Sequence, residues 1–308
     1  MIVNPRHVKK TAGLARPNED TPLIWTSQYG SVTFNLAGRE FPNGGMNEKG
    51  LVVETMTLNS TAYESATEKK PAVNEIQWIQ YVLDNAATVS DAIKLAKTVK
   101  IQKSYAPLHY MACDSLSNCA SFEYLRGKLV VHSGARMPFH VLTNDSYNDS
   151  LANLWTYQGF GGTEAIPQDA SSFSRFALAA ENIQNFSSSA DRSFAYGMET
   201  LERVKNPTGS AHSVWFLLYD PTHLQIRFHT LEAKNDKILR LNALQFDCAR
   251  TAKSIDMNNP TLTGDISEKL VDWTPELNGT LIEKNVFIPA SIQKLLATYP
   301  SLMTQCQP

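Results

Sequence analysis

Two neighbouring segments decide the fold of this sequence: Trp25-Thr26-Ser27-Gln28-Tyr29-Gly30-Ser31-Val32-Thr33-Phe34-Asn35 and Gly44-Gly45-Met46-Asn47-Glu48-Lys49-Gly50-Leu51. Within residues 31–37 apolar and polar side chains alternate, which is typical of a half-buried β-strand. Residues 51–58 are expected to form the next strand. The glycine-rich residues 43–50 predict a turn between them, because glycine adopts positive φ angles without steric cost. Residues 31–58 are therefore expected to form a hairpin-like unit.

Outside this unit, pairs of strands alternate with pairs of helices. Further strands are expected at 109–113, 119–124, 128–132, 213–219, 225–230 and 237–241. Helical spacing of apolar residues predicts helices within 73–83, 92–99, 176–186, 194–204 and, last, about 289–298. Ser90 or Asp91 is the expected N-cap of the second helix. This order predicts an α+β protein, the αββα sandwich, in which two antiparallel sheets pack face to face between helix pairs.

The composition excludes several classes of protein. The chain has 308 residues, and its 28 Lys and Arg residues nearly balance its 30 Asp and Glu residues, so the formal net charge is −2. Such a balance lacks the excess of basic residues that is typical of proteins that bind nucleic acid. The longest apolar run covers only 214–219, whereas a membrane-spanning helix needs about 18–20 residues. No linker or repeat is visible, and we expect residues 1–308 to form one domain.

The four cysteines show no metal-binding or redox pattern; they are Cys113, Cys119, Cys248 and Cys306. They form no Cys-x-x-Cys pair and lie near no histidine at zinc-binding spacing. In a chain of this length we expect buried or unreactive thiols and no disulfide framework. Neither a metal nor another cofactor is expected.

The two segments quoted first closely resemble the choloylglycine hydrolase family, which contains bile salt hydrolases and penicillin V acylases. Members of that family hydrolyse linear amide C–N bonds. Further matches follow in the family's order over nearly the whole chain: Asn4-Pro5-Arg6, Lys9-Lys10, Asp114 with Asn118 and Glu123, Leu142-Thr143-Asn144, Ser174-Arg175-Phe176, and Val214-Trp215 with Asp220. The resemblance implies an N-terminal-nucleophile hydrolase with the αββα fold, in agreement with the pattern of strands and helices.

The resemblance also implies three site residues. Asn144 matches the family's asparagine that donates a hydrogen bond to the developing oxyanion; the alternative is a local turn at 143–145. Arg175 matches the family's buried active-site arginine, and the alternative, an exposed cation near a helix N-terminus, is electrostatically poor. Thr57 stands where relatives carry a larger or amide side chain that contacts substrate, and an ordinary strand threonine is an equally good interpretation.

Other polar residues are given structural roles. Asn47 and Glu48 are interpreted as turn-forming, and Asp114 as shaping the turn that precedes Glu123. His109 lies on an expected strand, where a histidine with satisfied hydrogen bonds in the core is more common than a catalytic base.

The chain departs from the family at its start. The family's nucleophilic cysteine and the Gly-Arg-x-x-Asp stretch after it have no counterpart, since residues 1–12 contain neither Cys nor Asp. Thr11 could act as nucleophile only after cleavage before it, which the surrounding matches disfavour. We expect a catalytic member whose nucleophile lies upstream and whose first strands are missing here; a catalytically silent binding protein and an unstable fragment are the alternatives. The hydrophobic periodicity is intact throughout, which favours the first interpretation.

The expected function is hydrolysis of linear amides through a cysteine acyl-enzyme, with a small-molecule acyl amide as ligand. The sequence does not separate this reaction from acyl transfer to an amine, and it leaves bile salts, penicillin V and N-acyl homoserine lactones open as substrates. Homo-oligomers are common in the family, but no interface can be identified. A periplasmic or secreted location is expected if the full-length form carries a signal peptide, and a cytoplasmic one otherwise.

Overall fold

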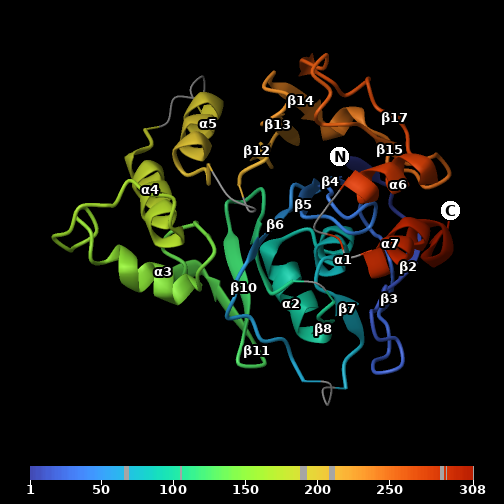
Figure 1. Cartoon of the computed structure of the whole chain (residues 1–308), viewed down its shortest axis with the longest axis horizontal. Helices are drawn as coiled ribbons and strands as arrows, with labels where there is room; N and C mark the ends of the chain where they lie inside the picture. Colours follow the sequence, from blue (N-terminus) through green and yellow to red (C-terminus); the bar gives the residue numbers. More distant parts are fainter. Residues whose placement is uncertain are drawn as a thin grey trace.

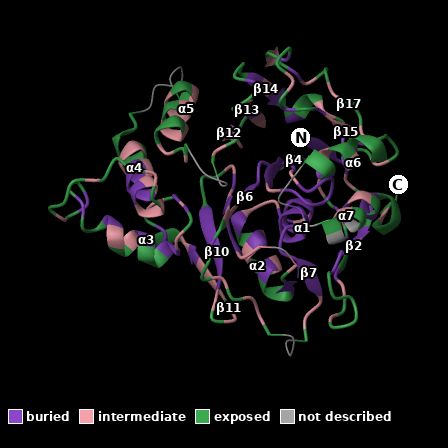
Figure 2. Ribbon diagram, in the orientation of Figure 1, coloured by how far each residue is buried: buried purple, intermediate pink, exposed green. Residues whose placement is uncertain are grey.

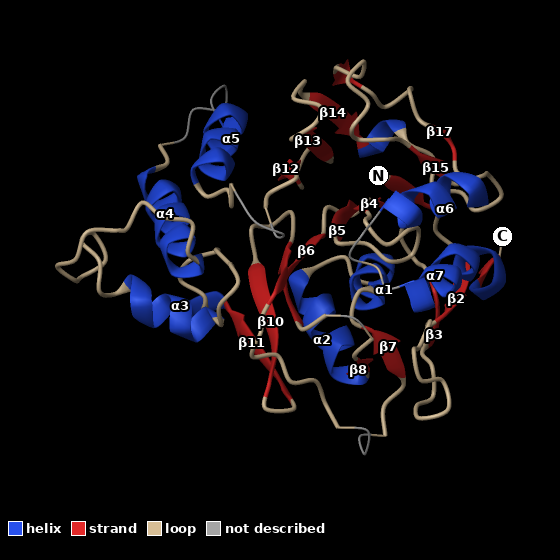
Figure 3. Cartoon of the chain, viewed as in Figure 1, coloured by secondary structure: helices blue, strands red, loops and turns tan. Residues whose placement is uncertain are grey.

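The computed structural model describes residues 1–65, 69–104, 106–187, 193–207, 212–284, 288 and 290–307. Two β-sheets lie at the centre, and helices flank them on both sides (Figures 1 and 3). Buried residues concentrate in the strands and in the helix faces that contact them, whereas most loops are exposed (Figure 2). Among the described residues, none of the helices combines the length and apolar character that a bilayer-spanning segment requires.

The larger sheet contains nine strands within the described residues, and every neighbouring pair in it is antiparallel. In spatial order the strands are β11 (Lys128–Ser133), β10 (Cys119–Leu125), β9 (Leu108–Cys113), β6 (Val52–Thr57), β5 (Gly44–Asn47), β4 (Ser31–Phe34), β1 (Ile2–Asn4), β15 (Lys253–Ser254) and β17 (Val271–Asp272).

The second sheet packs on one face of the first. Its strands in spatial order are β12 (Trp215–Asp220), β13 (Gln225–Thr230), β14 (Lys237–Arg240) and β16 (Gly264–Asp265). The first three are antiparallel, but β14 and β16 are parallel, so the expectation of a purely antiparallel sheet is wrong at this edge. Phe34 and Phe228, from facing sheets, meet edge to face with ring centroids 5.7 Å apart, and both are fully buried.

Helices complete the layers on both sides. The helices α1 (Gln77–Asn85) and α2 (Val89–Thr98) cover the outer face of the larger sheet, where the Trp78 and Tyr110 ring centroids lie 4.3 Å apart. On the opposite side α3 (Tyr147–Leu154) and α4 (Ser172–Asn185) pack over β9 and β10, while α5 (Ser193–Arg203) packs on β12. The predicted αββα arrangement is therefore confirmed.

Smaller elements surround this sandwich near the chain termini. They are a three-stranded sheet of β18 (Thr304–Cys306), β2 (Val8–Thr11) and β3 (Ile24–Thr26), a parallel pair of β7 (Ala72–Asn74) and β8 (Lys100–Gln102), and the helices α6 (Pro275–Lys284) and α7 (Ala290–Met303). Figure 1 shows α6 and α7 beside the strands at the chain termini.

The glycine-rich segment expected to be a turn contains a buried strand instead. Gly44 and Gly45 belong to β5, which lies between β4 and β6 and pairs with both. A Cβ atom at Gly44 would lie 2.2 Å from the Glu54 carboxylate, and one at Gly45 would lie 2.3 Å from the Val32 carbonyl oxygen. These glycines permit close packing rather than reversal of the chain. The turn itself falls later, at Gly50, where φ is +79°.

Three smaller expectations are also corrected. Val73 lies in β7, and the helix predicted around it begins only at Gln77. The N-cap of α2 is Thr88, whose hydroxyl accepts a hydrogen bond from the Asp91 amide. The last helix extends to Met303 rather than ending near residue 298, and residue 289, its predicted start, lies outside the described residues.

One acid connects the two sheets. Glu54 on β6 is half-buried and shares a hydrogen bond with the Tyr219 hydroxyl on β12. Burial raises the pKa of Glu54 to about 8, and the Tyr219 hydrogen bond opposes that rise only in part. The folded protein therefore holds this carboxyl in its protonated form at neutral pH, whereas the unfolded chain does not.

This difference predicts a pH-dependent stability. Because the pKa of Glu54 is higher in the folded than in the unfolded state, its contribution to the unfolding free energy is complete in acid. That contribution is lost as the pH rises through about 8. In the wild type we expect the unfolding free energy to fall by roughly 2 kcal/mol between pH 6 and pH 8. In Glu54→Gln this decline should be absent. Urea unfolding across this range measures the effect, with the exposed Glu232→Gln as matched control. Parallel pH profiles for the wild type and Glu54→Gln would contradict it.

Candidate active site

The structure brings the three predicted site residues into contact. Asn144 lies in the loop before α3, Arg175 in the first turns of α4, and Thr57 at the end of β6. The Arg175 Nη2 donates a 2.7 Å hydrogen bond to the Asn144 Oδ1. The Asn144 Nδ2 donates a 3.0 Å hydrogen bond to the Thr57 backbone carbonyl. Residues far apart in sequence thus meet at one exposed point where three elements converge.

Arg175 is partly buried rather than freely exposed at the surface. Its Nε donates a 3.1 Å hydrogen bond to the Ala170 carbonyl, which directs the guanidinium toward Asn144. Desolvation lowers the pKa of Arg175, and the nearby Asp145 raises it. The guanidinium remains a cation at neutral pH, because an arginine pKa starts far above 7. It therefore fixes the orientation of the Asn144 amide by holding its oxygen.

Two hydroxyl groups attach the Asn144 loop to the start of α4. The Asn144 amide donates to the Ser172 Oγ at 2.8 Å, and the Ser172 Oγ donates to the Thr143 Oγ1 at 3.0 Å. The Thr143 hydroxyl in turn donates to the Ser172 carbonyl at 3.1 Å. This pair was not predicted from the sequence, although Thr143 lies within one segment that matched the family and Ser172 lies two residues before another.

Thr57 contributes a backbone atom to this arrangement. Its carbonyl accepts from Asn144, while Thr57 itself is exposed at the end of β6. A ligand contact of its side chain remains a prediction.

The geometry is suited to stabilising negative charge on an oxygen. The Asn144 amide has two N–H groups, and within the described part of the chain the Thr57 carbonyl accepts one of them. The other is left for a bound oxygen at this exposed position. A side-chain amide whose oxygen is held by a cation is a preorganised donor of the kind that stabilises tetrahedral intermediates. In the described residues no group of three or more His, Cys, Asp or Glu side chains could hold a metal ion.

A scan against protein-family models matches residues 2–191 to the linear amide C–N hydrolases of the choloylglycine hydrolase family. The match spans more than half of the chain and includes Thr57, Asn144 and Arg175. The chain belongs to the choloylglycine hydrolase family.

Individual members of the family support this assignment. A penicillin V acylase from Pectobacterium atrosepticum is 33% identical over 197 residues, which cover 59% of this chain and 51% of that protein. The matched region thus spans about half the length of that curated relative. Among solved structures, a penicillin V acylase from Agrobacterium tumefaciens superposes with a TM-score of 0.77 at 25% identity, covering 89% of each chain.

A more distant structure shares the fold. A variant of the conjugated bile acid hydrolase from Clostridium perfringens superposes with a TM-score of 0.66 at 20% identity, covering 85% of this chain and 90% of that one. Together with the acylase structure, it confirms the mixed α+β architecture of the family.

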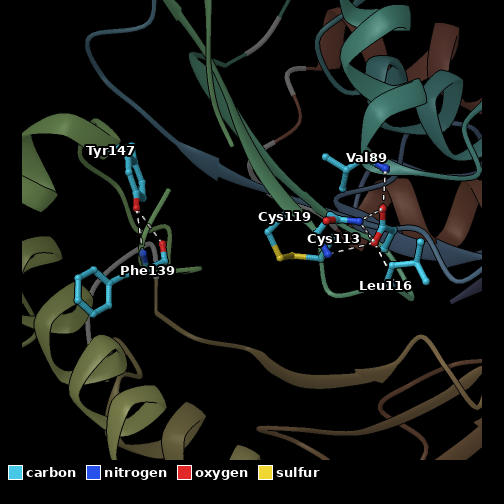
Figure 4. Close-up of a disulfide and its surroundings, with 8 residues drawn as sticks. Val89, Cys113, Leu116, Cys119, Phe139 and Tyr147 are labelled. Carbon is cyan, nitrogen blue, oxygen red and sulfur yellow. Dashed lines mark hydrogen bonds between the residues drawn. A yellow bond between two sulfur atoms is a disulfide. The ribbon is translucent and has the colours of Figure 1, made fainter. Parts of the chain in front are cut away.

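All four cysteines are disulfide-bonded, so the expectation of free thiols is wrong. Cys113 pairs with Cys119, with Cα atoms 4.2 Å apart, and Cys248 pairs with Cys306. The first bridge follows from register, because β9 and β10 place Cys113 directly opposite Cys119; Figure 4 shows it beside the turn that joins them. The second joins positions 58 residues apart, for which the sequence has no local signal. None of these sulfurs is available as the nucleophile that the family uses.

The structural roles expected for other polar residues are confirmed. The Asp114 carboxylate accepts from the backbone amides of Leu116 and Asn118 and from the amide of Val89 at the start of α2 (Figure 4). His109 is completely buried, with hydrogen-bond partners for both ring nitrogens.

The turn expected at Asn47 is confirmed as well. The Asn47 Oδ1 accepts from the amides of Lys49 and Leu51, and its Nδ2 donates to two carbonyls at the end of α1. The neighbouring Glu48 accepts from the Gly30 amide. Asn47 therefore forms the turn and also attaches it to the helix layer.

Proposed function

We propose that this chain is the larger part of a linear amide C–N hydrolase whose nucleophilic cysteine lies upstream of residue 1. The observation that carries the proposal is the contact of Asn144 with Arg175 and Thr57 in a member of this family. An asparagine whose oxygen is held by a cation at an exposed position suits an oxyanion donor.

The proposed reaction has two steps. The cysteine thiolate attacks the carbonyl carbon of an acyl amide, and the free Asn144 N–H stabilises the negative charge that develops on the oxygen. The C–N bond then breaks, the amine leaves with a proton, and a thioester remains. Water hydrolyses the thioester to a carboxylate and restores the thiol. The α-amino group of an N-terminal cysteine, with an ordinary pKa of about 8, is the proposed base.

The edge of the second sheet supports an upstream segment. Among the described strands, β12 has a hydrogen-bonded neighbour on one side, β13. Its sequence, Trp-Phe-Leu-Leu-Tyr-Asp at 215–220, is strongly apolar, yet most of it is only partly buried. A long apolar edge is a template for another strand, and native proteins usually cover it. A strand from upstream of residue 1 would cover this edge.

We propose an N-acyl amide of the penicillin V type as substrate. The two relatives with the higher identities, at 33% and 25%, are penicillin V acylases, whereas the bile acid hydrolase reaches only 20%. Conjugated bile salts and N-acyl homoserine lactones are the competing substrates.

We also propose that the protein functions in the periplasm or outside the cell. Two disulfides involve all four cysteines of the chain, and disulfides persist mainly in oxidising compartments. A cytoplasmic form would have these cysteines reduced, which thiol labelling of protein extracted from cells would detect.

The test compares this 308-residue chain with a form extended by the sequence encoded immediately upstream. We expect the extended form to release the free amine from penicillin V, and its Cys→Ser variant and the short chain to be inactive. Bile salts and N-acyl homoserine lactones are assayed in parallel to rank substrates. Hydrolysis by the short chain would refute the placement of the nucleophile. Binding of penicillin V without hydrolysis by either form would favour the alternative, a catalytically silent member that binds an acyl amide in the same pocket.

A further inference from the structure

A buried acid and a buried histidine hold both ends of the loop that carries Asn144. Glu123 on β10 and His109 on β9 are fully buried. The Glu123 Oε1 accepts a 2.8 Å hydrogen bond from the Tyr147 amide at the start of α3. The His109 Nε2 lies 2.7 Å from the Thr143 carbonyl. The contacts therefore fall on the residue before Asn144 and on the residue three positions after it.

The two side chains also contact each other, and that contact requires a proton. A carbonyl oxygen can only accept, so the His109 Nε2 must carry the hydrogen that it donates to Thr143. The other ring nitrogen, Nδ1, lies 3.2 Å from the Glu123 Oε1. Without a proton between them, a nitrogen lone pair would face a carboxylate oxygen. The His109–Glu123 pair is therefore stable when one proton is shared across this contact.

Other groups around the pair do not supply this proton. His132 on β11 faces the second Glu123 oxygen at 3.5 Å, and its Nδ1 lies 3.1 Å from the Ser121 hydroxyl. Burial lowers the pKa of His132; Glu123 opposes this effect and Arg136 adds to it. The Tyr147 hydroxyl is directed away, to the Phe139 carbonyl.

On β6, Met56 is opposite His109, and Glu54, the nearest acid on that strand, is opposite Met111. Its hydrogen bond to the Tyr219 hydroxyl directs it toward the second sheet. The contact between His109 and Glu123 thus joins the two anchors of the Asn144 loop.

We propose that His109 and Glu123 are positioning residues that fix Asn144 for catalysis through a shared proton. Together they set the path of the loop from Thr143 to Tyr147, while Arg175 orients the Asn144 amide itself. Loss of the hydrogen bond between His109 and Glu123 releases the loop and misplaces the oxyanion donor. The proposal rests on the proposed function for its catalytic meaning, but the coupling between the proton and the loop is a property of this chain alone.

The variant Glu123→Gln removes the negative charge of this side chain but keeps its shape. Its amide oxygen can still accept from the Tyr147 amide, so the start of α3 is retained, but the negative charge opposite His109 is lost. With the protein selectively labelled with 15N-asparagine, the backbone and side-chain signals of Asn144 are compared between the wild type and the variant; Asn144→Asp assigns them. We expect both signals to be shifted and broadened in Glu123→Gln, because the contact with His109 that holds the loop is weakened.

Two further variants complete the test. In His109→Gln the amide nitrogen reaches the Thr143 carbonyl but cannot also donate to Glu123, so the Asn144 signals should change while the protein stays folded. His140→Gln removes an exposed imidazole near the same loop and should leave the Asn144 signals unchanged.

In a form that hydrolyses penicillin V, Glu123→Gln should lower kcat with little change in KM. If the Asn144 signals are identical in the wild type, Glu123→Gln and His109→Gln, the proposal is wrong. Because the spectra require no turnover, an inactive extended form would overturn the proposed function and leave this result standing.

Discussion

A Lys10→Met variant is expected to lose about 3–5 kcal/mol of unfolding free energy at neutral pH, because the change leaves the buried Asp84 carboxylate without a cation and leaves Glu40 with Arg39 alone. The Lys10 ammonium lies 2.6 Å from the Glu40 Oε2 and 2.9 Å from the Asp84 Oδ2, and all three side chains are at most 1% exposed. Methionine has nearly the same length as lysine, so the cavity is small and the lost charge dominates.

The surroundings of Asp84 show how much depends on this cation. The Trp25 Nε1 and the Gln80 Nε2 donate to the Asp84 carboxylate at 2.7 and 2.8 Å. Burial raises the pKa of Asp84, and the adjacent Lys10 lowers it. Without Lys10 the upward shift grows, so the variant gains stability relative to the wild type as the pH falls and the acids take up protons. The deficit should therefore be smaller at pH 5 than at pH 8.

Urea unfolding at both pH values measures the effect, and the adjacent lysine is a matched control. Lys9 is on the same strand, but it is exposed, so Lys9→Met should stay within about 0.5 kcal/mol of the wild type. A combined Lys10→Met, Asp84→Asn variant should recover part of the loss, because Asp84 is then neutral and Glu40 keeps Arg39 as its ion-pair partner. Equal stabilities of Lys9→Met and Lys10→Met would show that the buried ion pairs contribute little.

The two lysines also illustrate where sequence analysis reaches its limit. Lys9 and Lys10 matched the family as a pair, and strand alternation alone sends one of them inward. The sequence does not show which of the two is buried. It also does not show that Glu40 and Asp84 contact the buried one, because these contacts join β2, a loop and α1. Apolar patterns predicted the longer strands of both sheets, because there the solvent-facing and buried sides differ in polarity. They did not predict β5 or the short strands β15, β16 and β17.

The failures have specific physical causes. Gly44 and Gly45 were interpreted as turn residues, because close strand packing and chain reversal both select glycine. The disulfide between Cys248 and Cys306 joins a loop to the C-terminal strand, and no spacing rule predicts such a long-range bridge. Among the site residues, Asn144 and Arg175 were found through the family resemblance. His109 was interpreted as a core histidine and Glu123 only as a match to the family, since their contact with each other and with the Asn144 loop exists only in three dimensions.

Replacing Asn144 by alanine in a form that hydrolyses penicillin V is expected to lower kcat by about 10²–10³-fold, the usual effect of removing one oxyanion donor. KM should change little, because the donor acts on charge that develops only in the transition state. Steady-state kinetics measures both parameters. The fold should survive, since Asn144 is exposed and its backbone amide still reaches the Ser172 hydroxyl.

Arg175→Lys tests whether Asn144 must be oriented as well as present. Arginine donates from Nε to the Ala170 carbonyl and from Nη2 to the Asn144 Oδ1, and a single ammonium group cannot reproduce both directions. We expect a loss of about tenfold to a hundredfold in kcat, intermediate between the wild type and Asn144→Ala, and little additional loss when the two substitutions are combined.

The matched control is Asn185→Ala at the exposed end of α4, which should retain wild-type kinetics. A large rise in KM with unchanged kcat for Asn144→Ala would assign Asn144 to substrate binding. Fully additive losses in the double variant would show that Arg175 acts on the substrate independently. Non-additive losses confined to kcat would mean that the guanidinium works through the amide it holds.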